Sequence, residues 1–230
     1  MHAAWATTLT VPGDANIFGA GHSLPPAPGG GGAGELPAEF DLGFTAGSGV
    51  VLVFSSVTGS VTLNAGTGNN ANDPDGIGSA SNIGVNSFGG ISGVVAPNAG
   101  FLAGVFLGPS EPTDPAPLRL DFTVVGTSFT SLSPQLNQVF FIGDGLTGDG
   151  TGTVQQFNVP SGATRLFLGL VDAPSYHGDP GAYGDNIGAF SATFTVPEPS
   201  ALKLLDVAIG LAALGLWCNR RLRQIQTSLE

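Results

Sequence analysis

Short apolar runs, separated by turn-forming residues, are the feature that most limits how this chain can fold. Glycine, proline, asparagine and aspartate interrupt the runs, and no helical periodicity appears before residue 200. Runs of this length and spacing are typical of strands. We expect strands at 40–44, 49–55, 60–63, 101–107, 118–125, 138–142, 153–159, 164–170 and 189–196. The pattern predicts an all-β fold, a jelly-roll β-sandwich over residues 7–195.

The composition supports one folded domain rather than disorder. The 37 glycines and 17 prolines require many turns, while the 42% hydrophobic content is enough for a single core. Residues 7–34 are turn-rich, and we expect residues 25–34, which are mostly proline and glycine, to form a flexible segment without packing capacity. The only cysteine, Cys218, lies near the end of the chain, so no internal disulfide can form.

The charge of the body restricts its partners. Residues 1–196 contain fourteen acidic residues and two arginines, Arg119 and Arg165, a formal net charge of −12. Such a surface repels phosphate backbones and anionic head groups, so no nucleic-acid partner is expected. Divalent cations and neutral ligands fit this charge better.

The first residues have features of the end of a signal peptide. Ala4-Trp5-Ala6 fits the small-x-small pattern that precedes a signal-peptidase site, although residues 1–6 contain no apolar stretch. We interpret residues 1–6 as the remnant of a signal peptide whose start lies upstream. The alternative is an ordinary N-terminal stub.

Three unlike elements follow one another at the C-terminus. They are a Pro197-Glu198-Pro199 motif within residues 196–200, an apolar run over residues 201–218, and an arginine cluster. The run predicts a C-terminal hydrophobic helix of about 18 residues, near the lower limit for crossing a membrane. The arginines are Arg220, Arg221 and Arg223, and they favour the cytoplasmic side.

This tail, residues 196–230, closely resembles the PEP-CTERM sorting signal that exosortases process. The resemblance implies export, transient anchoring in the inner membrane, removal of the tail by an exosortase, and release or attachment at the cell surface, often alongside exopolysaccharide. Lys203 and Asp206 depart from the family by making the span less hydrophobic. The alternative is a plain anchor or an amphipathic helix.

Oxygen-bearing groups crowd the glycine-rich loop at residues 179–190. Calcium takes six to eight oxygen ligands, which carboxylates, amides and backbone carbonyls supply. The alternative is that aspartate and asparagine form turns there through bonds to the backbone.

The body also resembles exported proteins with a galactose-binding-like domain, and residues 179–190 are similar to the end of the bacterial calcium-dependent galactophilic lectins. The similar blocks are residues 11–21, 90–93, 102–107, 140–145 and 163–169. The resemblance implies that Asp185 and Asn186 bind Ca²⁺ through their side chains and Ala182 through its carbonyl. The upstream carboxylate is Asp172 or Asp179, a choice that stays open because residues 173–178 are extra relative to the lectins.

Other candidate groups are less specific. Tyr176 and His177 lie beside the proposed loop and are candidate ligand contacts, as is Asp75. The acidic loops at 72–76 and 143–150 suit cations, or simply turns. No nucleophile elbow and no phosphate-cradling loop is present.

The sequence therefore predicts a noncatalytic, calcium-dependent carbohydrate-binding module associated with the cell surface or matrix. The alternatives are a structural matrix protein without sugar binding and a secreted hydrolase.

Overall fold

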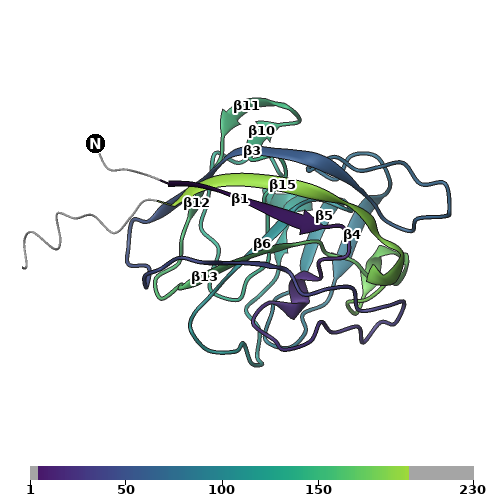
Figure 1. Cartoon of the computed structure of the whole chain (residues 1–230), viewed down its shortest axis with the longest axis horizontal. Coiled ribbons are helices and arrows are strands. Elements are labelled where there is room, and N and C mark those ends of the chain that lie inside the picture. Colours follow the sequence, from purple (N-terminus) through teal and green to yellow (C-terminus); the bar gives the residue numbers. More distant parts are fainter. Residues whose placement is uncertain (1–4, 197–230) are drawn as a thin grey trace, which may run out of the picture. The chain divides into compact units, whose positions relative to one another are not determined.

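A computed structural model describes residues 5–196, which form one compact unit. Its regular secondary structure is almost entirely β-strand, joined by long loops, so the all-β prediction is confirmed (Figure 1). No helix within residues 5–196 is long and apolar enough to cross a membrane. The predicted hydrophobic helix at 201–218, the Pro197-Glu198-Pro199 motif and the arginine cluster lie outside the described residues.

The largest sheet has five strands in the order β1-β15-β3-β12-β8. Its three long strands, β1, β15 and β3, run antiparallel and lie side by side in Figure 1. The strands of this sheet are β1 (Trp5–Pro12), β3 (Val51–Thr62), β8 (Ser131–Leu132), β12 (Gln156–Asn158) and β15 (Ile187–Val196).

Two four-stranded sheets and one hairpin complete the unit. The orders are β2-β13-β6-β9 and β14-β4-β5-β7, and β10 pairs with β11. Their strands are β2 (Ala38–Asp41), β4 (Ser81–Val85), β5 (Val94–Asn98), β6 (Ala103–Leu107), β7 (Leu120–Asp121), β9 (Phe140–Phe141), β10 (Leu146–Gly148), β11 (Thr151–Val154), β13 (Arg165–Gly169) and β14 (His177–Gly178).

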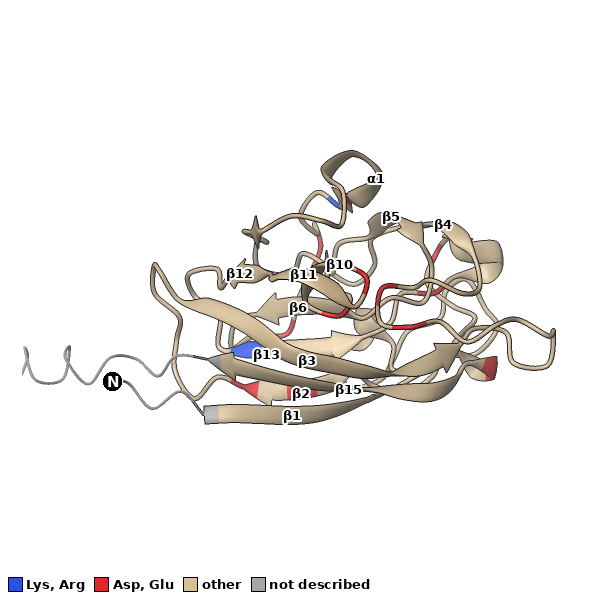
Figure 2. Cartoon of the chain, turned by 90° about the horizontal axis from the view of Figure 1, so that it is seen from above, with Lys and Arg blue, Asp and Glu red and all other residues tan. Residues whose placement is uncertain are grey.

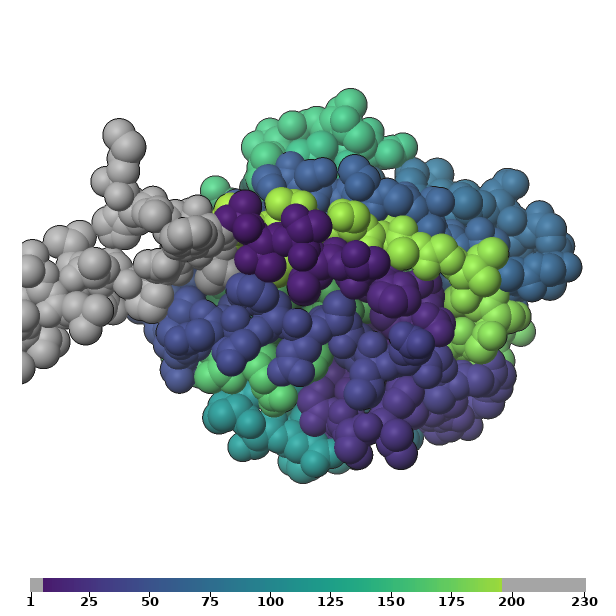
Figure 3. Space-filling model, viewed as in Figure 1, coloured from purple at the N-terminus to yellow at the C-terminus, as the bar shows by residue number. Residues whose placement is uncertain are grey.

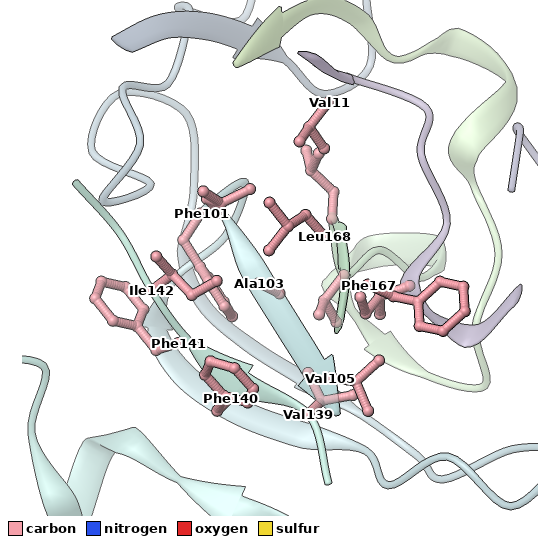
Figure 4. Packing of buried hydrophobic residues seen from close by; sticks show 14 of the residues in the cluster. Val11, Phe101, Ala103, Val105, Val139, Phe140, Phe141, Ile142, Phe167 and Leu168 are labelled. Carbon is pink, nitrogen blue, oxygen red and sulfur yellow. The ribbon is translucent and has the colours of Figure 1, made fainter. Parts of the chain in front are cut away.

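Aromatic side chains join the five-stranded sheet to the sheet of β2, β13, β6 and β9. The rings of Phe40 on β2 and Phe194 on β15 lie 5.1 Å apart, and those of Phe140 on β9 and Phe157 on β12 lie 5.4 Å apart. Each buried aromatic ring removes a large apolar area from water and adds about 1 kcal/mol in ring contacts. Figure 4 shows part of this core around β6, with Ala103 and Val105 near Phe140. The two sheets thus share one core.

Several strand predictions were wrong in detail. Residues 7–12 were expected to be turn-rich, but they belong to β1 (Trp5–Pro12), which eight consecutive pairings with β15 hold in place. The run at 118–125 is not one strand, because β7 ends at Asp121 and a helical turn, α1 (Phe122–Val125), follows. The Asp121 side chain accepts from the Thr123 N–H and caps that turn. The strands β4 and β5 were not predicted.

Candidate functional site

The predicted calcium loop lies between the last two long strands, where the chain passes from β13 to β15. Two short 3-10 turns, η2 (Pro174–Tyr176) and η3 (Tyr183–Asp185), shape it. Because β13 and β15 belong to different sheets, this connection lies at one end of the packed sheets. It begins with Asp172 and ends with Asn186.

Asp172 and Asn186 are in direct contact and both are buried. Asn186 Nδ2 donates to Asp172 Oδ2 over 2.9 Å, and the Ala173 N–H donates to Asp172 Oδ1 over 2.8 Å. The other end of the Asn186 amide, Oδ1, is buried without a hydrogen-bond partner among the described residues. A buried oxygen without a donor is costly, about 1–3 kcal/mol, unless an ion or water pairs with it.

Burial also perturbs the Asp172 carboxyl. Desolvation raises its pKa to about 7, the hydrogen bonds from Asn186 and Ala173 oppose that rise, and the nearby charge of Asp185 adds to it. The ionised Asp172 carboxylate therefore has no nearby positive charge that would stabilise it in this buried position. A cation would supply it.

Tyr183 holds the start of the loop, residues 170–172, through its hydroxyl group. Its buried hydroxyl donates to the Leu170 carbonyl over 3.1 Å and accepts from the Asp172 N–H over 3.0 Å. Burial raises the pKa of Tyr183 well above its ordinary value, so the ring stays neutral. The preceding residue, Ala182, adopts a left-handed conformation with φ +65°. The hydroxyl thus anchors the backbone on which Asp172 sits.

The glycine-rich segment expected to be flexible packs against this loop instead. Backbone bonds join Ala182 N to Gly30 O, Tyr183 N to Gly32 O and Gly184 N to Gly31 O at 2.7–3.2 Å. A Cβ on Gly32 would lie 2.7 Å from the Gly184 Cα, so only glycine allows this approach. Figure 3 shows the purple N-terminal part against the yellow-green segment that ends in β15. The prediction that residues 25–34 lack packing capacity was wrong, because backbone pairing replaces side-chain packing.

The structure brings together part of the predicted ligand set. Asp172 and Asn186 touch, and Asp185 is exposed on the adjacent turn. Asp179 is exposed and lies elsewhere, with its Oδ1 accepting from Asn86 Nδ2 over 2.9 Å. Of the two upstream candidates, Asp172 is therefore the one beside Asn186.

The two predicted ligand contacts after Asp172 have different surroundings. The Tyr176 hydroxyl accepts from Asn64 Nδ2 over 3.0 Å, so it faces the loop that follows β3. His177 is exposed, and its Nδ1 lies 3.0 Å from where a Cβ on Gly84 would be. Asn64 was missed in the sequence because an asparagine beside glycines signals only a turn.

Asp75 does not join this loop but belongs to a second acidic cluster. Carboxylate oxygens of Asp73, Asp75 and Asp149 lie within 4.8 Å of one another, so the two acidic loops that were weaker cation candidates meet in space. Desolvation, followed by the charge of Asp144, raises the pKa of Asp75 to about 7. Figure 2 shows acidic residues in red beside β10 and β11. The structure groups Asp75 with Asp73 and Asp149 rather than with Tyr176 and His177.

The two described arginines do not neutralise either cluster. Arg165 donates to the Gly108 and Ser110 carbonyls, and its Nη1 lies 3.7 Å from Glu39. Arg119 is exposed on another part of the surface, where the hydrogen bond from the Thr123 side chain and, to a smaller extent, the Arg119 charge lower the pKa of Asp121. Both acidic groups are therefore without a basic partner in the part of the chain that the structure describes.

No family model matches the chain, and no curated protein or solved structure resembles it at a significant level.

Proposed function

We propose that this is an exported, surface or extracellular-matrix-associated protein whose body is a noncatalytic, calcium-dependent carbohydrate-binding module. The observation that carries the proposal is the buried Asp172–Asn186 pair with the unpartnered Asn186 Oδ1. The Asn186 carbonyl oxygen has no donor among the described residues, and the buried Asp172 carboxylate beside it accepts two hydrogen bonds but has no described cation as a partner. Such a pair suits a hard, oxygen-seeking ion.

The residues present fit Ca²⁺ by their chemistry. Asp172, Asn186 and Asp185 offer side-chain oxygens, and Ala182 offers a carbonyl on a left-handed backbone. Calcium tolerates irregular shells of six to eight oxygens, and sugar hydroxyls can occupy positions that the protein leaves open. When bound, the ion would supply the positive charge that Asp172 lacks. The chain's own part is to bury and orient these oxygens through Tyr183 and the backbone of the segment 29–34.

The finer fold that we propose is a galactose-binding-like jelly roll. Two mainly antiparallel sheets packed through phenylalanines support it, as does the position of the candidate site at the connection between the sheets. Sites on loops held by a rigid β scaffold are common in binding proteins.

The proposed localisation rests on the C-terminal sequence. An exosortase and the inner membrane would act on residues 196–230, after which the body reaches the cell surface or the exopolysaccharide matrix. The order of motif, apolar run and arginines supports this proposal.

One observation favours a structural matrix protein without sugar binding. Both oxygens of Asp172 already accept hydrogen bonds within their own loop, as in a purely architectural turn. A secreted hydrolase has less support, because the cavity bordered by Asp75 and Asp149 is about 120 Å³. Small-molecule sites usually have about 300–1,000 Å³.

The test is a thermal melt of the full-length chain in EDTA, Mg²⁺ and Ca²⁺. At a hundredfold excess over the dissociation constant, Ca²⁺ stabilises the native state by about 2.7 kcal/mol. The melting temperature should therefore rise by roughly 5–10 °C, and Mg²⁺ should do less because it demands a tighter octahedral shell. A glycan array with galactose- and mannose-terminated glycans, in Ca²⁺ and in EDTA, then tests the carbohydrate.

Matched variants assign the ion to a cluster. Asp172→Asn should abolish the Ca²⁺ shift, while Asp149→Asn should leave it intact. A shift lost only in Asp149→Asn would move the ion to the cluster of Asp73, Asp75 and Asp149. Equal melting temperatures in Ca²⁺ and EDTA would favour the structural matrix protein.

A further inference from the structure

The loop that follows β3, residues 64–69, lies against the proposed calcium loop. The register of β15 and β3 places Ile187 opposite Thr62, so the residues before Ile187 and those after Thr62 leave the sheet at the same end. The Ala65 N–H donates to the Asp185 carbonyl over 2.9 Å. Asn64, the residue before Ala65, donates to the Tyr176 hydroxyl, so one loop contacts both Tyr176 and the backbone of Asp185.

Amide groups from this loop hold the Tyr176 hydroxyl. Asn64 Nδ2 donates to it over 3.0 Å and Asn69 Nδ2 over 3.5 Å, while Asn69 Nδ2 also donates to the Leu63 carbonyl. The hydroxyl oxygen acts as acceptor in both contacts, so its own proton is left to donate. Among the described residues no acceptor takes that proton.

Backbone conformations around Tyr176 are unusual. Asn64, Ser175, Tyr176 and Ala182 have φ between +54° and +65°, and only two other non-glycine residues in the described part of the chain have positive φ. Asparagine tolerates this region, but for tyrosine, serine and alanine it costs on the order of 1–2 kcal/mol each. Strain of this kind persists where surrounding contacts fix it, often at ligand sites. Here it turns the partly buried Tyr176 ring toward the loop 64–69.

We infer that Tyr176 forms the ligand wall beside the calcium ligands and donates its hydroxyl proton to an oxygen of a neutral sugar, with Asn64 as its positioning residue. This inference rests on the proposed function. An anionic ligand fits this site less well than a neutral one, because the loop carries Asp172 and Asp185 and both described arginines are engaged or exposed elsewhere. A hydroxyl-rich neutral ligand can accept from Tyr176 and pack its C–H groups on the ring.

The experiment measures binding of galactose and of galacturonate to the full-length chain in saturating Ca²⁺, together with the Ca²⁺ melting shift. Tyr176→Phe keeps the ring and removes the proton donor. Loss of one hydrogen bond, about 1 kcal/mol, should weaken galactose binding roughly fivefold. The Ca²⁺ shift should stay as in the wild type. Asn70→Ala, an exposed change next to the loop 64–69, is the control and should leave both readouts unchanged.

Asn64→Gly is the second variant, because glycine accepts the left-handed backbone at this position. It should weaken galactose binding by a similar factor without removing the Tyr176 hydroxyl. Equal galactose affinity in wild type, Tyr176→Phe and Asn64→Gly overturns the inference alone. If galacturonate binds more tightly than galactose, the inference that the ligand is a neutral sugar is wrong. A wild-type chain that shows the Ca²⁺ shift but binds neither sugar overturns the carbohydrate part of the proposed function and the inference with it.

Discussion

The two acidic regions of this domain are built differently. In the first, between β13 and β15, the neighbours Asp172 and Asn186 are buried, and the glycine segment 29–34 pairs through its backbone with residues 182–184 of the same loop. In the second, Asp75 and Asp149 come from loops far apart in sequence, and Asp149 is exposed.

Hydrogen bonding separates the two regions further. In the second region Asp73 Oδ1 accepts from the N–H groups of Asp75 and Ile77, and both oxygens of Asp144 accept from its own loop. These bonds are what acidic turns make without any ion. In the first region a buried oxygen of Asn186 is left over. The comparison teaches that the count of nearby carboxylates matters less for a cation site than the oxygens that the fold leaves unsatisfied.

The largest expected effect comes from separating the glycine segment from the first region. Gly32→Ala places a Cβ 2.7 Å from the Gly184 Cα, a backbone atom that cannot move aside. Alanine is also unfavourable at the φ of +94° that this position adopts. From the clash and the backbone strain together, we expect the free energy of unfolding to fall by about 4 kcal/mol and the Ca²⁺ shift to be lost.

Gly30→Ala is the matched control for that prediction. Its φ is +82°, but a Cβ there meets nothing within 4 Å. Gly30→Ala should lower the free energy of unfolding by about 1 kcal/mol. Urea unfolding measures this free energy for both variants. Equal losses in Gly30→Ala and Gly32→Ala would show that the close approach of the segment does not hold the site.

The same comparison at the second region should give a smaller effect. Gly143→Ala directs a Cβ into Asp75 Oδ1 and the Phe141 ring, both side-chain atoms, whereas Gly150→Ala at the same φ of +62° meets nothing. Side chains can shift where backbone cannot, so we expect Gly143→Ala to cost about 2 kcal/mol and Gly150→Ala about 1. The Ca²⁺ shift should survive both. Its loss in Gly143→Ala would indicate that the ion depends on Asp75.

The sequence predicted the strands that carry long apolar runs. β3, β6, β13 and β15 lie within or next to predicted runs because burial in a shared core requires consecutive or alternating apolar residues. β1 was missed because its sequence, Trp5–Pro12, has alanine or threonine at four of the five positions after Trp5 and so has no apolar run. Only its pairing with β15 makes it a strand.

For the candidate site, the sequence showed which residue types are present but not which of them lie together in space. Asp185-Asn186 in a glycine loop signalled oxygen ligands, but the choice between Asp172 and Asp179 depends on how η2 folds between them. The contact of the loops at 72–76 and 143–150, and the packing of residues 29–34 on the site, are set by tertiary pairing. Sequence spacing alone carries no information about such long-range contacts.

The smallest expected effect is the pH dependence of stability, and it tests the two regions separately. The pKa of Asp172 and that of Asp75 are each about 7 in the folded domain, against an ordinary value of 3.8. Between about pH 4 and pH 7 the native state therefore binds more protons than the unfolded chain. The free energy of unfolding should fall as pH rises through this window, by at most about 1.4 kcal/mol per pH unit for each group.

Urea unfolding in EDTA at pH 5, 6, 7 and 8 measures this slope, and Asp172→Asn and Asp75→Asn should each remove a part of it. Ca²⁺ then distinguishes the regions, because an ion bound beside Asp172 stabilises the ionised carboxylate and takes over the role of the proton. In Ca²⁺ the Asp172 part of the slope should disappear, whereas the Asp75 part should remain if turns alone explain that cluster. If the pH dependence of the free energy of unfolding is the same in Ca²⁺ and in EDTA, no ion binds at Asp172. If Ca²⁺ removes only the part of this dependence that Asp75 contributes, the ion binds at the second region instead.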